Sequence, residues 1–271
     1  MLGRLLLLWT LSPLCLAAPL RLVVQEFAPY SFAGSDHQPA GATVEMVKEA
    51  CNYWPEGCQI TLLPNLRARK QLELGEADGM FPLAWSETRA RTLRYSLPLC
   101  KASWGIFARS EETDRPLTLA RLGDERIGVT KGSFSETLLR HLDTALRQQG
   151  LPPMRLDLNV NDDYASLLKL ERQGRYSLYF SNIDVALHRL NLNGESQIRL
   201  WKKSHEANYY IAFNRERVSE ARLNAFNQIL SRLEAQGNLL RHRVRWGLSS
   251  PLPDHRLHTL FPPEPRHHQA N

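Results

Sequence analysis

The feature that most constrains the fold of this chain is a regular alternation of short apolar segments with longer amphipathic ones. Three apolar segments have the length and composition of strands: RLVVQEF (21–27), CQITLLP (58–64) and ADGMFPLA (77–84). Between them, TVEMVKEACNYW (43–54) and NLRARKQLELG (65–75) carry apolar residues at helical spacing. Strands that alternate with helices favour an α/β fold with largely parallel sheets. We therefore predict an α/β protein, with Thr43 available to cap its first helix.

An internal repetition extends this pattern to the second half of the chain. LELGEADGMFPLAW (72–85) and LERQGRYSLYFSNI (170–183) each combine a helix, a glycine, a strand and an exit into a polar turn. Two matching units predict two similar α/β lobes that face a cleft. Ligands bind beyond the carboxyl ends of the strands in such sheets, so both segments should end at the cleft.

The two ends of the chain differ in composition from the rest. Residues 1–17 combine Arg4, the apolar run LLLLWTLSPLCL and a small-residue exit, which is typical of a cleaved signal peptide. No later apolar run reaches the length of a membrane span. We therefore expect an exported, soluble protein of the periplasm. Residues 251–271 are rich in proline and histidine, and we expect a disordered tail there.

Three cysteines follow the predicted signal peptide: Cys51, Cys58 and Cys100. The segment CNYWPEGC can close a short disulfide loop between Cys51 and Cys58 in an oxidising compartment. Such a loop would contribute about 2–3 kcal/mol to stability. The alternative is a pair of buried, reduced thiols. Cys100 is expected to be a packed thiol after a strand.

The charge of the chain is basic, with a formal net charge of +6 and a pI near 9.3. The arginines are scattered along amphipathic helices instead of forming a basic stripe with interleaved aromatics, so we expect no nucleic-acid partner. A positive surface still favours small anions. The chain shows no Ser-His-Asp pattern, zinc-ligand spacing or paired cleft carboxylates, so we predict no enzyme, no metal and no cofactor. Glu26 is the one acid that we would test for acid–base chemistry.

A crowded group of cations follows the predicted strand at residues 77–84. Arg89, Arg91 and Arg94 lie within six residues of one another, close to Trp85. Like charges at this density repel unless they are solvated or bind an anion. The segment is therefore a candidate for ligand binding.

Several segments, in order along residues 21–247, resemble the bacterial periplasmic solute-binding proteins of family 3. They are EFAPYSF, GATVEMVKEAC, LELGEADGMF, SETRARTLRYSLPL, RIGVTKGSFSETLL and ILSRLEAQGNLLRHRVRWG. The cysteine spacing is similar to that of members that bind histidine or lysine, arginine and ornithine. The resemblance implies two α/β lobes of the type II periplasmic-binding-protein fold, joined by crossing strands. We expect one lobe at residues 19–101 plus 206–250 and the other at 102–205.

The resemblance also implies a ligand site. Arg89 lies at the family's carboxylate-binding arginine, whose planar guanidinium can donate two charge-assisted hydrogen bonds. Phe27 lies at the aromatic position that stacks on the ligand, with Tyr30 close behind. Ser133 and Phe134 begin a helix whose free amides favour an anion, although Ser133 and Glu136 also fit a capping box.

Three departures from the family pattern bear on the ligand. Members that bind amino acids place an aspartate where this chain has Asn182, and a serine or threonine where it has Ala84. An asparagine cannot supply charge to an α-ammonium group, which argues against a standard α-amino acid. The variant segment LPNLRARKQL would bring Arg67 near the cleft. A second anionic group, or a ligand without an ammonium, would explain these features.

These observations predict a monomeric solute-binding protein that captures a small carboxylate-bearing solute, such as an amino acid or a related compound. The expected membrane partner is the permease of an ABC importer. One alternative is a sensor protein that presents its closed form to a membrane receptor. A fold-derived enzyme is the remaining alternative.

Overall fold

The computed structural model describes residues 18–159, 163–172, 174–192 and 197–261, so the predicted signal peptide lies outside the described residues. In these described ranges, ten strands form one sheet. Eight of them follow the order β4 (Cys58–Leu63), β1 (Leu20–Gln25), β5 (Gly79–Ala84), β11 (Ile198–Asn214), β7 (Cys100–Arg109), β10 (Leu178–Asn182), β8 (Arg126–Thr130) and β9 (Arg155–Asn159). β6 (Leu93–Tyr95) and β12 (His258–Thr259) also pair with β11. β2 (Phe32–Ala33) and β3 (Pro39–Ala40) form a separate hairpin.

The sheet changes direction where the two long strands cross the molecule. β1 is parallel to β4 and β5, and β8 is parallel to β9 and β10. β7 and β11 are antiparallel to each other and to their outer neighbours β10 and β5. The sheet therefore has a parallel part at each end and antiparallel crossing strands between them. The prediction of an α/β fold with mainly parallel sheets is confirmed.

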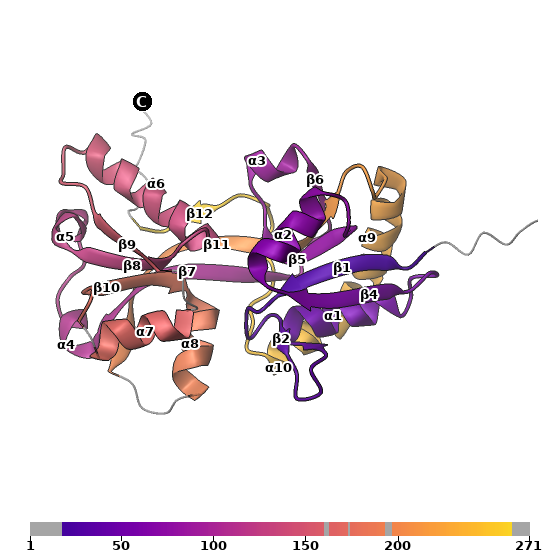
Figure 1. The fold of residues 1–271 in the computed structure, drawn as a ribbon, viewed down its shortest axis with the longest axis horizontal. Helices are drawn as coiled ribbons and strands as arrows, with labels where there is room; N and C mark the ends of the chain where they lie inside the picture. Colours follow the sequence, from indigo (N-terminus) through magenta and orange to yellow (C-terminus); the bar gives the residue numbers. More distant parts are fainter. Residues whose placement is uncertain (1–17, 160–162, 173, 193–196, 262–271) are drawn as a thin grey trace, which may run out of the picture.

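Helices cover each parallel part and produce two lobes, which Figure 1 shows at the two ends of β7 and β11. The first lobe carries α1 (Ala42–Cys51), α2 (Asn65–Glu73), α3 (Glu87–Ala90), α9 (Glu220–Ala235) and α10 (Asn238–Arg245). The second lobe carries α4 (Ser110–Thr113), α5 (Leu119–Asp124), α6 (Phe134–Gln148), α7 (Asp163–Arg172) and α8 (Ile183–Leu192). The predicted lobe boundaries, at residues 101–102 and 205–206, fall inside β7 and β11. These lobe boundaries remain a prediction.

Local sequence explains how α6 forms. Its buried leucines follow helical spacing and face the core: Leu138, Leu139, Leu142 and Leu146. The Ser133 hydroxyl accepts a hydrogen bond from the Glu136 amide at 3.1 Å and caps the helix. The Glu136 carboxylate in turn accepts the Gly132 amide at 2.7 Å. The start of α6 is thus fixed by its own side chains.

The prediction that Thr43 can cap α1 is wrong. The N-cap is Gly41, whose φ of 114° is a conformation that favours glycine. A Cβ at Gly41 would lie 2.6 Å from the Tyr30 carbonyl oxygen. The buried Thr43 hydroxyl donates instead to that same carbonyl at 2.8 Å. The close approach of the segment that carries Tyr30 determines this helix start.

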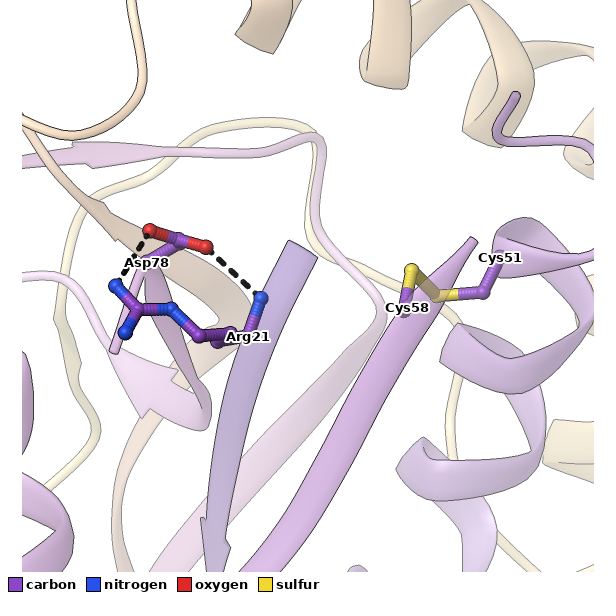
Figure 2. The surroundings of a disulfide bond; sticks show 4 residues. All are labelled: Arg21, Cys51, Cys58 and Asp78. Carbon is purple, nitrogen blue, oxygen red and sulfur yellow. Dashed lines mark hydrogen bonds and ion pairs between the residues drawn. A yellow bond between two sulfur atoms is a disulfide. The ribbon is translucent and has the colours of Figure 1, made fainter. Parts of the chain in front are cut away.

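The predicted disulfide between Cys51 and Cys58 is present, with an S–S distance of 2.02 Å and a Cα–Cα distance of 5.5 Å. Figure 2 shows it joining the end of α1 to the start of β4. In the same view Arg21 of β1 is bound to Asp78, which accepts the Arg21 amide at 2.9 Å. Cys100 is a buried free thiol. Covalent and ionic contacts thus fix this edge of the first lobe.

The prediction of a disordered tail from residue 251 is wrong for the residues up to 261. β12 pairs with β11 (Figure 1), and Phe261 is buried. The buried Asn208 side chain binds the Leu252 amide at 2.8 Å and the Leu252 and Asp254 carbonyls at 3.0 and 2.9 Å. These contacts outweigh the effect of a proline-rich composition. Residues 262–271 lie outside the described residues.

Candidate ligand-binding site

A cavity of about 660 Å³ lies between the two lobes. Its first-lobe wall is formed by the carboxyl ends of β1 and β5, the start of α2 and Arg89 of α3. Its second-lobe wall is formed by the turn after β8, the start of α6 and part of α8. This is the place where an α/β sheet binds ligands, and the volume suits a small molecule.

Aromatic side chains from both lobes form one connected group along the cavity. Phe27 stacks on Tyr30 with ring centroids 5.4 Å apart, and Tyr209 of β11 packs edge-on against Tyr30 at 5.0 Å. Trp104 of β7 contacts Tyr209 at 5.7 Å and Phe134 at 5.3 Å. Four of the five line the cavity, whereas Tyr30 is fully buried behind Phe27. These rings give the cavity low-dielectric walls, which strengthen any charged contact inside it.

Arg89 crosses the cavity from the first lobe. Its backbone amide is capped by Ser86, and its guanidinium donates one hydrogen bond to the Ala84 carbonyl at 3.0 Å. The guanidinium carbon lies 5.7 Å from the centre of the Phe134 ring in the second lobe. Burial lowers the pKa of Arg89, and the hydroxyls of Tyr95 and Tyr209 partly oppose this effect. A guanidinium still has four further N–H donors to offer a ligand.

The start of α6 faces the cavity from the second lobe. Ser133, Phe134 and Ser135 all line it. The Ser133 hydroxyl is already engaged, because it caps Glu136 and donates to the Thr130 carbonyl at 2.6 Å. The backbone amides of the first turn are therefore the groups that this helix can direct at an anion.

The structure brings four of the predicted site residues together at the cavity: Arg89, Phe27, Ser133 and Phe134. The other four do not line it. Tyr30 donates a hydrogen bond to Asp184, and Trp85 packs against His255 at 5.0 Å. Asn182 is buried and uses both polar atoms internally. Arg67 is exposed on α2.

Other lining residues escaped the sequence prediction: Gln25, Asn65, Arg69, Trp104, Lys131, Arg189 and Tyr209. Helical spacing offered one usable signal. Arg69 lies four residues after Asn65 and therefore shares its face of α2, whereas Arg67 points elsewhere. Trp104 and Tyr209 could be found only once β7 and β11 were paired.

The cavity is strongly cationic. Arg69, Arg89, Lys131 and Arg189 line it, against the single carboxylate of Glu26. Burial lowers the pKa of Arg69, and the neighbouring charge of Arg89 lowers it further. A guanidinium whose charged form is disfavoured by burial and by a neighbouring cation is stabilised by an anionic ligand.

A family model for bacterial extracellular solute-binding proteins, family 3, matches residues 20–249. The chain belongs to this family. No curated protein matches it in sequence. The family assignment agrees with the two lobes and the cavity between them. None of the helices in the described part of the chain is long and apolar enough to cross a membrane.

Solved structures share the fold of this family 3 protein at low sequence identity. A histidine kinase sensor domain with similarity to periplasmic binding proteins is 20% identical, with a TM-score of 0.72, 86% of this chain covered and 99% of that chain. An ancestral arginine-binding protein bound to arginine is 19% identical, with a TM-score of 0.70 and coverages of 85% and 99%. An ancestral amino acid-binding protein, a precursor of cyclohexadienyl dehydratase, is 16% identical, with a TM-score of 0.68 and coverages of 84% and 95%. The type II periplasmic-binding-protein fold is thereby established.

Proposed function

We propose that this protein captures a small carboxylate-bearing solute between its lobes and delivers it to the permease of an ABC importer. The observation that carries the proposal is the position of Arg89. Its guanidinium lines the cavity and reaches the start of α6 in the opposite lobe. A carboxylate at this point would contact a cation from one lobe and backbone amides from the other.

This arrangement couples binding to lobe closure. An anion held by Arg89 gains the amides of Phe134 and Ser135 only when the lobes approach each other. Such a ligand has a higher affinity for the closed conformer and shifts the population toward it. A membrane partner that recognises the closed conformer then receives mainly loaded protein. β7 and β11, which connect the lobes, are the segments that would bend.

The second candidate function is sensing. It is favoured by the fold shared with a histidine kinase sensor domain. Deleting the gene distinguishes the two candidates once a ligand is known. Loss of uptake of the labelled ligand supports transport, whereas loss of a transcriptional response with normal uptake supports sensing. Catalysis by a member of this fold is a third possibility, which product analysis after incubation with the ligand tests directly.

The binding step is tested by a thermal-shift screen of carboxylates, amino acids and amines, followed by small-angle scattering. A ligand at a hundredfold excess over its dissociation constant should stabilise the protein by about 2.7 kcal/mol. It should also reduce the radius of gyration as the lobes close. Ligands that bind tightly without compaction would contradict the proposed mechanism.

A further inference from the structure

A group of polar side chains lies on the first-lobe wall of the cavity, beside Arg89. Gln25 ends β1, and its register partner Leu63 ends the parallel strand β4. The start of α2 follows β4 directly, so Asn65 lies next to the end of β1. Arg69 follows one helical turn later on the same face. All three of Gln25, Asn65 and Arg69 line the cavity.

Each of these residues carries a buried polar atom that has no hydrogen-bond partner within the described part of the chain. The atoms are Gln25 Oε1, Asn65 Oδ1 and Arg69 Nε. Only eight described side-chain atoms share this property, and three of them belong to this one wall. Buried polar atoms are normally paired, so such a concentration indicates a place where a ligand supplies the partners.

The charge of this wall is only partly compensated, because Glu73 is the one acid in the described part of the chain whose charge favours that of Arg69. Among the described residues, no carboxylate forms an ion pair with Arg69 or with Arg89. The two guanidiniums lie close enough for Arg89 to disfavour the charge on Arg69. One carboxylate at Arg89 leaves Arg69 with the charge of Glu73 alone, which forms no ion pair with it. A ligand with two negative groups would neutralise both.

The cavity offers a positively charged group one carboxylate and two uncharged acceptors, the amide oxygens of Gln25 and Asn65. Glu26 is the one acid on its lining, and its exposed carboxylate accepts the Ala33 amide at 3.1 Å. Asn182 donates to the Tyr209 hydroxyl at 3.2 Å and accepts from the Val185 amide at 3.0 Å. Asp184 accepts from Tyr30 and does not line the cavity. An ammonium group would therefore have one charged partner, Glu26, against four cationic side chains on the lining.

We propose that Arg69, with Asn65 and Gln25, forms a second anion-binding subsite, and that the solute is a small dicarboxylate without an ammonium group. This inference rests on the proposed function. One carboxylate binds Arg89 and the amides of α6, and the other binds Arg69. A side-chain amide presents either its oxygen or its NH₂ group when it turns by half a rotation, so Asn65 and Gln25 can donate to the second carboxylate.

Matched compounds test the ligand class by calorimetry. Succinate, aspartate and butyrate share a four-carbon chain, and glutarate, glutamate and pentanoate share a five-carbon chain. At least one dicarboxylate should bind about tenfold or more tightly than both its amino-acid and its monocarboxylate counterparts. An amino acid that binds more tightly than the matched dicarboxylate overturns the proposal, and so does a panel in which neither dicarboxylate binds.

Matched variants test the subsite. Arg69→Gln should lower the affinity for the best dicarboxylate by about tenfold or more. The remaining affinity should be close to that of the matched monocarboxylate. Arg67→Gln, on the exposed side of the same helix, should stay within about twofold. If Arg69→Gln does not fold, the affinity of Asn65→Ala for the dicarboxylate tests the same subsite. If Arg89→Ala abolishes binding while Arg69→Gln and Asn65→Ala leave it unchanged, the subsite is wrong and the proposed function stands. If no carboxylate or amino acid binds or compacts the protein, the proposed function fails as well.

Discussion

The hydroxyl of Tyr30 in the first lobe donates a hydrogen bond to the carboxylate of Asp184, at the start of α8 in the second lobe. Tyr30 is fully buried, and Asp184 is half-buried. Burial raises the pKa of Asp184 and, together with the Asp184 charge, the pKa of Tyr30. This direct contact between the lobes can exist only while they are close together. It therefore stabilises the closed conformer independently of the ligand.

We predict that Tyr30→Phe weakens ligand binding. The variant keeps the stacked ring but removes the hydrogen bond and leaves the Asp184 carboxylate buried without this donor, at a cost of about 1–3 kcal/mol to the closed conformer. Calorimetry should show a loss of affinity, and scattering of the ligand-free protein should show a larger radius of gyration. Tyr53→Phe, an exposed tyrosine of the first lobe, is the control. An unchanged affinity for Tyr30→Phe would show that this contact does not contribute to closure.

We predict that Arg89→Ala weakens binding by about a hundredfold or more, since charged hydrogen bonds contribute about 1.5–3 kcal/mol each. Arg89→Lys should recover only part of this loss, because lysine keeps the charge but not the planar guanidinium. Arg91 is exposed, so Arg91→Ala should bind within a few-fold of the parent. Binding by Arg89→Ala that is close to the parent's would mean that the ligand lies elsewhere.

Arg94 shows how the crowded cations of residues 89–94 are separated. It donates to the Arg215 carbonyl at 2.7 Å and the Val218 carbonyl at 3.3 Å, and so ties β6 to the turn before α9. Arg91 faces solvent, and Arg89 faces the cavity. Of the three cations that marked this segment as a candidate for ligand binding, only Arg89 therefore lines the cavity.

The fold could be predicted because strand and helix patterns are local, and the disulfide because its spacing is short. The site could be predicted only in part. Arg67 and Arg69 differ by about 200° around α2, and the sequence alone does not fix which face meets the cavity. Tyr30 binds Asp184 and Asn182 binds Tyr209, both far away in sequence, so these contacts followed only from the packing of the two lobes.

We predict that replacing both Cys51 and Cys58 by serine lowers the free energy of unfolding by about 2–3 kcal/mol, since the bridge restricts the unfolded chain. Denaturant unfolding of the double variant and of the reduced parent should agree. Cys100 is buried and burial raises its pKa, so it should react with an alkylating agent only after unfolding. Labelling of Cys51 or Cys58 without a reductant would argue against the bridge.

We predict that His205 makes the protein less stable as the pH falls. Burial, followed by the nearby charge of His141, lowers the pKa of His205 from 6.5 to about 4. The unfolded chain therefore binds a proton that the folded protein excludes, and stability decreases as the pH falls from about 6.5 to about 4, by up to about 3 kcal/mol. His205→Asn, whose side-chain amide can still hydrogen-bond to Ser204, should show a smaller loss across this range. If the unfolding free energies of parent and variant depend equally on pH, His205 is not the cause of the destabilisation.

The last prediction concerns the segment after residue 250, which crosses the molecule from the first lobe toward β11 (Figure 1). Truncation after Ser250 removes all three hydrogen bonds between Asn208 and this segment, the pairing of β12 with β11, and the contact of His255 with Trp85. It also removes Phe261, whose side chain is buried, and so exposes the residues that Phe261 covers.

Each lost interaction with the buried Asn208 costs about 1 kcal/mol, so the truncated protein should unfold at least about 2 kcal/mol more easily. Truncation after Phe261 is the matched control, because it keeps all of these contacts, and it should match the parent. Asn208→Ala should reproduce much of the loss in the full chain. If truncation after Ser250 leaves the unfolding free energy unchanged, the segment packs on the surface without stabilising it, and pairing with β5, β6 and β7 is enough to hold β11 in position.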